Sequence, residues 1–167
     1  MQDKVHEVLF TVKEKEFEIE LLNKLRFNYI SLGKHYSTKT GKIWGLIKFN
    51  IRLLVIMLKF KPDITLSHGS MYAAQVSWLI RKPHISFEDT FNFEQIRLYK
   101  PFTNCILTGS YKHPDLGKNN IKFHGYHELA YLHNNYFIPD KEVITNLGIK
   151  KNEKYVILRF VSWNATH

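Results

Sequence analysis

The sequence predicts an α/β fold in which a Rossmann-like parallel sheet is flanked by helices. The main observation is residues 62–89, where an apolar run, Ile64 to Leu66, is followed by a polar turn, a helical stretch and a second apolar run. This succession of strand, turn, helix and strand is the right-handed βαβ unit of a parallel sheet. A later apolar run, 104–107, also ends in a small polar turn. The strand predicted at 155–161 has no helix after it, so the last unit is incomplete.

The first part of the chain predicts two strands and a helix. Residues 6–12 are rich in β-branched residues, which indicates a strand. Residues 14–26 carry apolar groups at helical spacing, with acids early and bases late, as the helix dipole favours. A short strand at 27–32 ends at Gly33.

The most apolar stretch, 43–60, predicts a helix that is largely buried against the sheet. Its cations Lys48, Arg52 and Lys59 fall within roughly 40–60° of one another on a helix wheel, and the remaining circumference is apolar. A membrane span needs about 20 apolar residues with few charges, so this stretch is too short and too charged. The alternative is an amphipathic helix that uses the three cations on a membrane surface or a partner chain.

The remaining elements follow from composition and turn residues. Pro62 ends the long helix, and the βαβ unit contributes a helix from Met71 to Ile80. Further predictions are a helical segment at 91–99, strands at 104–107 and 121–124, a connector at 139–149 with a short helix, and the strand at 155–161.

The net charge of +9 favours anionic partners, although a solvated basic surface explains it equally well. Lysines and arginines are scattered and no recognition motif is present, so we expect no nucleic acid partner. Cys105 is the only cysteine and lies in an apolar run, which predicts a core thiol. The N-terminus is charged and lacks a leader-like apolar region, which predicts a cytoplasmic protein. Peripheral membrane contact belongs to the alternative for the 43–60 helix.

Polar residues follow the predicted strands at the sheet edge where open α/β folds bind ligands. His68 is a candidate general acid or base, and Glu88 and Asp89 are candidate bases or sugar-hydroxyl acceptors. The alternative is that these side chains have no chemical role and only cap a helix or contact solvent. The turns around them can bind an anion through a helix N-terminus, or can serve only as caps. The ligand-binding candidates in these turns are Ser67, Gly69, Ser70, Thr108, Gly109 and Ser110.

The histidines at 124, 127 and 133, with Glu128, do not match a recognised zinc-ligand spacing. A Walker loop, a GxGxxG motif and a serine nucleophile elbow are all missing from the sequence. We therefore predict no metal and no cofactor.

Three segments together resemble one known family. They are Lys61-Pro-Asp-Ile-Thr-Leu-Ser-His-Gly-Ser70, Gly125-Tyr-His-Glu-Leu-Ala-Tyr-Leu-His133 and Tyr155-Val-Ile-Leu-Arg-Phe-Val-Ser-Trp-Asn164. The chain is similar over nearly its whole length to the domain-of-unknown-function family numbered 354. Members resemble GT-B type proteins such as UDP-N-acetylglucosamine 2-epimerases and nucleotide-sugar glycosyltransferases, which have two Rossmann-like domains with a cleft between them.

The resemblance implies functional residues as well as a fold. In the epimerases, acids after successive N-domain strands carry the proton chemistry, and Glu88 is at a position similar to one of them. Where the epimerase pattern has Gly-Asp, this sequence has His68-Gly69. Gly125, His127 and Glu128 of the second segment join the ligand-binding candidates.

The resemblance also implies a chain truncated at both ends. We expect residues 1–138 to form a Rossmann-like N-terminal domain without its first strand and helix. Residues 139–153 would be a connector, and 154–167 the first strand of a missing second domain, which a complementing chain could supply.

The leading functional hypothesis is a fragment or remnant of a protein that acts on nucleotide-activated sugars, related to glycosyltransferases or epimerases. Its partner in the full-length family would be a nucleotide sugar or glycan, and the chain alone would be inactive. The alternative is a non-catalytic binding module that contacts anionic lipid or a partner chain through its basic helix.

Overall fold

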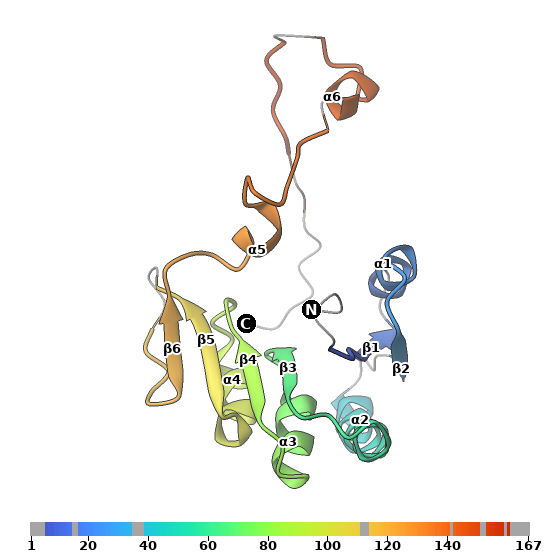
Figure 1. The fold of residues 1–167 in the computed structure, drawn as a ribbon, viewed down its shortest axis with the longest axis vertical. Helices are drawn as coiled ribbons and strands as arrows, with labels where there is room; N and C mark the ends of the chain where they lie inside the picture. The colour runs from blue at the N-terminus through green and yellow to red at the C-terminus, as the bar shows by residue number, and fades with distance from the viewer. Residues whose placement is uncertain are drawn as a thin grey trace.

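The computed structural model describes residues 6–14, 17–34, 39–110, 114–140, 142–150, 153–158 and 160. Parallel strands alternate with flanking helices (Figure 1), so the predicted Rossmann-like α/β class is confirmed. In chain order the elements are β1 (Phe10–Glu14), α1 (Glu18–Lys24), β2 (Tyr29–Lys34), α2 (Lys39–Phe60), β3 (Thr65–His68), α3 (Met71–Leu79), β4 (His84–Phe87), α4 (Phe93–Tyr99), η2 (Lys100–Phe102), β5 (Cys105–Gly109), β6 (Asn120–Phe123), α5 (Leu129–Leu132) and α6 (Glu142–Asn146).

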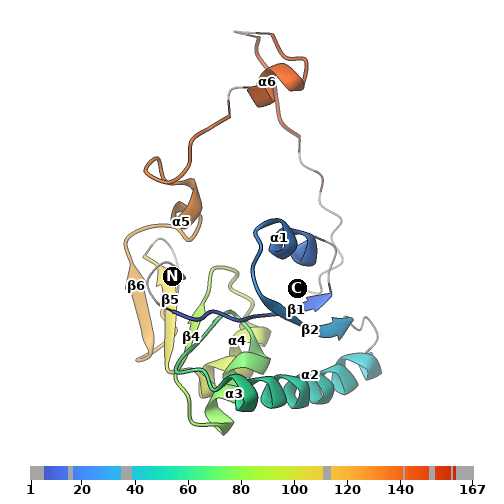
Figure 2. The ribbon, with the colours of Figure 1, turned by 45° about the vertical axis from the view of Figure 1, so that its right-hand side comes forward.

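The strands form two parallel sheets. β1 pairs with β2, and the second sheet has the order β3-β4-β5-β6. The long helix α2 connects β2 to β3 and packs beside α3 (Figure 2). The parallel pairing within the second sheet brings the carboxyl ends of β3 to β6 to one edge.

The buried core has two parts that lie on either side of α3. One part joins α2 to β2 and α3, and the other joins α3 to α4 and β5. Burial of each large aliphatic or aromatic side chain contributes about 1.5–3 kcal/mol. The first part contains Leu32, Phe49, Leu53, Ile56, Met57 and Val76. The second contains Ala74, Ile96, Tyr99, Ile106 and Leu116.

Side-chain caps fix the starts of the two helices that follow β3 and β4. The Ser70 hydroxyl accepts a hydrogen bond from the backbone N–H of Ala73 at 3.3 Å, and the Asn92 amide oxygen accepts one from Gln95 at 3.2 Å. Such caps satisfy backbone donors that the first helical turn leaves unpaired.

The structure corrects the prediction that α2 is largely buried. One face of α2 is buried in the core, but a second apolar stripe is 46–61% exposed. The apolar residues of α2 lie on two faces of the helix. Only one of these faces packs against the rest of the fold. The exposed stripe consists of Trp44, Ile47, Ile51, Val55 and Leu58.

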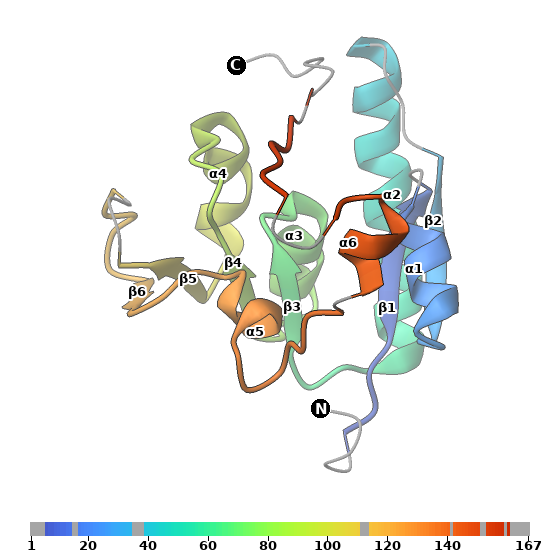
Figure 3. The same ribbon diagram turned by 90° about the horizontal axis from the view of Figure 1, so that it is seen from above.

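The strand predicted at 155–161 is not formed by the residues that the structure describes there. Residues 153–158 have no regular secondary structure, and Tyr155 to Leu158 are 52–83% exposed. A strand needs a hydrogen-bonded neighbour, and no described strand lies beside this stretch. The rest of the predicted strand, apart from residue 160, falls outside the described residues. Figure 1 shows α5 and α6 beyond the carboxyl ends of β4 to β6, and Figure 3 shows both helices in front of the sheets when seen from that side.

Within the described residues, no helix combines the length and apolar character that crossing a membrane requires.

Candidate functional site

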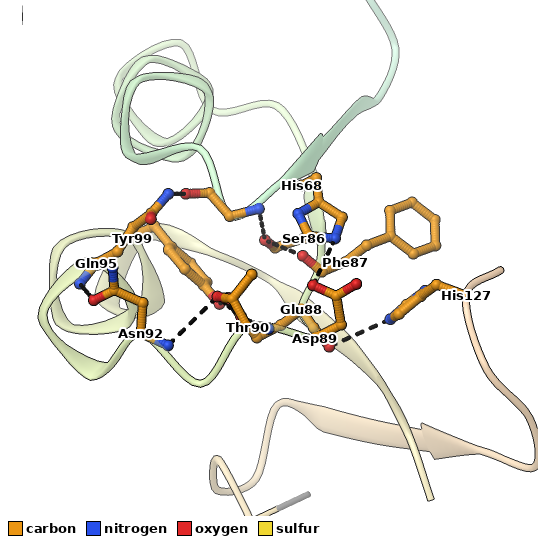
Figure 4. A network of polar contacts seen from close by, with 11 residues as sticks. His68, Ser86, Phe87, Glu88, Asp89, Thr90, Asn92, Gln95, Tyr99 and His127 are labelled. Carbon is orange, nitrogen blue, oxygen red and sulfur yellow. Dashed lines mark hydrogen bonds and ion pairs between the residues drawn. The ribbon is translucent and has the colours of Figure 1, made fainter. Parts of the chain in front are cut away.

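The candidate site lies where β3 and β4 end side by side (Figure 4). The two strands are in parallel register, with His68 opposite Phe87, so the residues that follow Phe87 come next to His68. The structure therefore brings together the three residues that the sequence analysis singled out for chemistry, His68, Glu88 and Asp89.

His68 and Asp89 are in polar contact at the edge of the sheet. The Nε2 atom of His68 is 3.1 Å from Oδ1 of Asp89, and the two side chains are 52% and 27% exposed. A carboxylate that holds an imidazole in place is the usual arrangement for a histidine that transfers protons. Because both groups reach solvent, this pair is open to a ligand.

Glu88 is held quite differently from its neighbour Asp89. It is only 2% exposed. Its Oε2 accepts a hydrogen bond from the Tyr99 hydroxyl at 2.6 Å, and its Oε1 accepts bonds from the backbone and hydroxyl of Thr90 at 2.8 and 2.7 Å. Burial raises the pKa of Glu88, but the bonds from Tyr99 and Thr90, together with the nearby His68, outweigh it, so the pKa lies below its ordinary value. Glu88 is thus a fixed carboxylate under the site.

Hydrogen bonds hold the turn after β3 against β4 and α4. The N–H of Gly69 donates to the Phe87 carbonyl and the Ser86 hydroxyl, and the Gln95 amide donates to the Gly69 carbonyl. Gly69 has φ +60°, and a Cβ there would lie 3.4 Å from Oε2 of Glu88. Only glycine combines this backbone conformation with so close an approach at low cost.

His127 joins the site from the segment that follows β6. Its Nε2 lies 3.3 Å from the Glu88 carbonyl oxygen. Its ring packs edge-on against Phe87, Phe123 and His68, with centroid distances of 5.6, 5.0 and 6.1 Å. The aromatic cluster therefore places a second imidazole beside His68.

The serines of the β3 turn already have partners within the protein. The Ser67 hydroxyl is 2.9 Å from Nε2 of His84 and accepts a bond from the Ser70 N–H. Ser70 is the cap of α3. His84 is fully buried, and burial lowers its pKa to about 4, so this imidazole is neutral. Capping thus accounts for Ser70, and Ser67 ties the turn to β4.

The other predicted residues do not contact His68 or Asp89. Thr108 is buried and accepts a bond from the Asn120 amide, while Ser110 lies 3.3 Å from Nδ1 of His124. The remainder occupy other places: Gly109 at the end of β5, Gly125 in the turn after β6, Glu128 exposed before α5, and Lys48, Arg52 and Lys59 on α2.

A pocket opens on the other side of His68, toward β1. Its polar lining includes Lys13, Glu18, Ser67, His68 and Gln95. The Lys13 ammonium lies 4.6 Å from the centroid of the Tyr72 ring. This cation–π contact keeps a positive charge at the wall of the pocket. His68 therefore separates this pocket from the Asp89 and His127 side of the site.

Three site residues were missed by sequence reasoning: Thr90, Gln95 and Tyr99. Thr90 could have been found, because a hydroxyl two residues after a strand-end acid often bonds back to it. Gln95 and Tyr99 act through the docking of α4, which no local pattern predicts. Metal binding has no support among the described residues, where no three His, Cys, Asp or Glu side chains gather into a possible site.

The chain is similar to a known protein family and to a solved structure. A family model described as "Protein of unknown function (DUF354)" matches residues 1–167. A search of curated proteins finds no match. Among solved structures, the crystal structure of MurG from Acinetobacter baumannii matches with a TM-score of 0.57 and 12% sequence identity. The match covers 74% of this chain and 38% of MurG, so the chain spans well under half of that protein and the likeness concerns the fold.

Proposed function

The chain belongs to the DUF354 family, and from this premise we propose that it forms one wall of a cleft that binds a nucleotide-activated sugar. The observation that carries the proposal is the exposed His68–Asp89 pair, which sits beside His127 at the ligand-binding edge of a parallel sheet. These groups can bind sugar hydroxyls and move protons, which transfer or epimerisation of a sugar requires.

The likeness to MurG concerns the fold, and it supports the α/β architecture of the proposed wall. In GT-B type proteins two Rossmann-like domains face each other across a cleft, and the second domain usually supplies the nucleotide site. Residues 1–138 would be the first of these domains, 139–153 a connector, and 154–167 the start of the second. The proposal therefore gives residues 1–138 the sugar side of the cleft.

Each site residue has a distinct role in the proposal. His68 is the proton-transferring group, and Asp89 orients it through the 3.1 Å contact. Glu88 is a positioning residue, because it is buried and its carboxylate is occupied by Tyr99 and Thr90. His127 contributes a sugar contact. In the proposal the outer rim of the wall is formed by the accessible candidates Ser67, Ser70, Ser110, Gly125 and Glu128. Gly69, Thr108 and Gly109 are buried, so they support the rim from beneath.

Saturation-transfer NMR with UDP-N-acetylglucosamine tests this function. We expect magnetisation to reach the sugar protons more strongly than the uracil protons, because the nucleotide half of the cleft is not part of the proposed wall. A His68→Ala variant should lose the sugar signal, whereas His133→Ala, an exposed histidine after α5, should keep it. Transfer mainly to the uracil protons would contradict the proposal.

A second candidate function is favoured by the exposed apolar stripe of α2. Lys48, Arg52 and Lys59 flank this stripe, which gives the helix an apolar surface with a cationic margin. Helices of this kind lie in the surface of anionic membranes. In this case the chain binds anionic lipid through α2, and vesicle binding by charge-reversed variants tests this function.

A further inference from the structure

A second pocket opens at the end of the sheet that is opposite the candidate site. Figure 1 shows the carboxyl ends of β4 to β6 toward α5, so the amino ends of these strands lie at the far end of the sheet. The loop from α3 to β4 and the loop from η2 to β5 meet there, and they line a pocket of about 560 Å³. Ligand pockets in proteins commonly have volumes of about 300–1,000 Å³.

The pocket carries positive charge. Arg81 and Lys82 contribute to its lining, and no acidic residue does. Within the described part of the chain, neither of these two side chains forms an ion pair. Two cations at one concave surface without a neutralising acid attract a ligand of negative charge. An acidic ligand therefore matches this lining.

An aromatic wall lies beside the two cations. The Trp78 side chain is 61% exposed, and its ring contacts Phe102 edge-on at a centroid distance of 5.5 Å. This contact holds the indole in place and leaves more than half of its surface open. Tryptophan and arginine are enriched among the residues that carry most of the binding energy of protein interfaces. The wall thus suits an aromatic or aliphatic side chain as an anchor.

Two side-chain amides of the lining each use only one of their two ends within the protein. The amide oxygen of Asn104 accepts a hydrogen bond from the backbone N–H of His84 at 2.9 Å. The amide nitrogen of Asn119 donates to the Thr103 carbonyl at 3.2 Å. No described residue bonds to the Asn104 amide nitrogen or to the Asn119 amide oxygen, so the pocket offers one donor and one acceptor. A peptide bond has the complementary groups, a carbonyl oxygen and an N–H.

We propose that this pocket binds an acidic peptide segment of a partner protein. An aromatic or aliphatic side chain of the segment packs against Trp78, and carboxylates on either side of it pair with Arg81 and Lys82. The backbone of the segment bonds to the two amides. The pocket precedes β4, whereas Asp89 follows this strand, so the proposal is independent of the sugar-binding proposal.

Isothermal titration calorimetry with the full chain tests the proposal. The probe is the unlabelled peptide Gly-Asp-Glu-Phe-Glu-Asp-Gly. We expect saturable binding at one site, and this binding should weaken as the ionic strength rises, because salt screens the carboxylate contacts. A peptide with asparagine and glutamine in place of the acids should bind about tenfold more weakly or less. Replacing its phenylalanine by alanine should also weaken binding, because the anchor is lost.

Arg81 can be removed without strain. Its φ is +56°, a backbone conformation that glycine adopts at low cost, so Arg81→Gly should stay folded. Arg26→Gly is the matched control, because Arg26 follows α1 with φ +55° and carries the same charge. We expect Arg81→Gly to weaken peptide binding by about tenfold and Arg26→Gly to leave it unchanged.

The aromatic wall has its own matched pair of variants, Trp78→Ala and Trp44→Ala. Both indoles are 61% exposed, one on α3 and the other on α2. Trp78→Ala should weaken peptide binding by about tenfold or more, whereas Trp44→Ala should not change it. Circular dichroism and urea denaturation establish that all four variants are folded.

Three results would overturn the proposal. They are no saturable binding by the folded chain, equal binding of the uncharged peptide, and equal losses of binding within either matched pair of variants. Displacement of the bound peptide by single-stranded RNA or by phosphatidylserine vesicles, in a manner that Arg81→Gly weakens, would also overturn it. The pocket would then belong to a nucleic acid or lipid surface.

Discussion

The hydroxyl of Tyr99 donates a 2.6 Å hydrogen bond to Oε2 of Glu88, and both side chains are almost completely buried. This contact joins the end of α4 to the residue that follows β4, directly before Asp89 in the sequence. Burial, then the bond to Glu88, raises the pKa of Tyr99 far above its ordinary value, so the tyrosine remains a donor. The exposed His68–Asp89 pair thus rests on a buried, fully bonded support.

Replacing Tyr99 by phenylalanine should destabilise the protein and loosen the site. A buried carboxylate that loses one of its donors costs about 1–3 kcal/mol of unfolding free energy. Urea denaturation of Tyr99→Phe measures this loss. The variant should also weaken the sugar signal in saturation-transfer NMR, because Asp89 follows Glu88 directly. Unchanged stability would show that the bond does not contribute to folding.

Gly69→Ala should destabilise the protein more than a matched glycine substitution elsewhere. Both Gly69 (φ +60°) and Gly117 (φ +94°) have backbone conformations that disfavour a side chain. At Gly69 the added Cβ would also lie 3.3 Å from the Gln95 amide nitrogen and 3.4 Å from Glu88, whereas at Gly117 it meets only the flexible Lys100 side chain. We expect about 1 kcal/mol of additional destabilisation for Gly69→Ala in urea denaturation. Equal losses for the two variants would mean that crowding at Gly69 has no effect.

Local sequence patterns were sufficient to predict most elements and their order. The polar turns after 64–66 and after the strand that ends before Glu88 correctly placed His68 and Asp89 at one sheet edge, because parallel strands end together. The strand-end rule says nothing about which acid is buried. That difference between Glu88 and Asp89 depends on Tyr99, a partner brought in by the docking of a helix.

Features that depend on long-range strand pairing or helix packing could not be predicted from local sequence patterns. The division of the strands into two sheets follows from which edges meet, and β-branched runs such as 6–12 and 155–161 do not contain that information. The same limit explains α2: apolar residues surround most of the helix, and the pattern alone does not show that only one of its faces is covered.

Acid should destabilise the protein through His84 before the carboxylates protonate. The pKa of His84 falls from 6.5 to about 4 in the folded protein because of burial, so the unfolded chain binds the proton more readily. Stability is therefore full above 6.5 and decreases as the pH falls toward 4. Between about pH 7.5 and about pH 5 this loss amounts to about 2 kcal/mol in urea denaturation.

The control for this pH dependence is His84→Asn, which lacks the titrating imidazole. Asparagine can still hydrogen-bond near Ser67 and Thr103, the two partners of His84. The variant should be less stable at neutral pH. Its loss of unfolding free energy between about pH 7.5 and about pH 5 should be smaller than that of the original chain by most of the about 2 kcal/mol assigned to His84. A pH dependence equal to that of the original chain would assign the effect to other groups.

Charge reversal on α2 should separate the lipid-binding candidate from a purely structural helix. Each basic residue near an anionic bilayer contributes about 1 kcal/mol, so reversing Lys48, Arg52 and Lys59 to Glu should lower binding to phosphatidylserine-containing vesicles about a hundredfold or more. A control reversal of three exposed lysines elsewhere, Lys24, Lys118 and Lys154, has the same net charge.

The apolar stripe provides the second half of this test, because electrostatic attraction alone does not distinguish insertion from surface adsorption. Ile51→Gln with Val55→Gln leaves the charge unchanged and removes two exposed apolar groups from the centre of the stripe. If α2 lies in the membrane surface, this double variant should bind vesicles more weakly at high salt, where the apolar contribution dominates. Vesicle co-sedimentation measures both effects. Equal binding by the α2 charge reversal and its control would exclude α2 as the lipid-binding element.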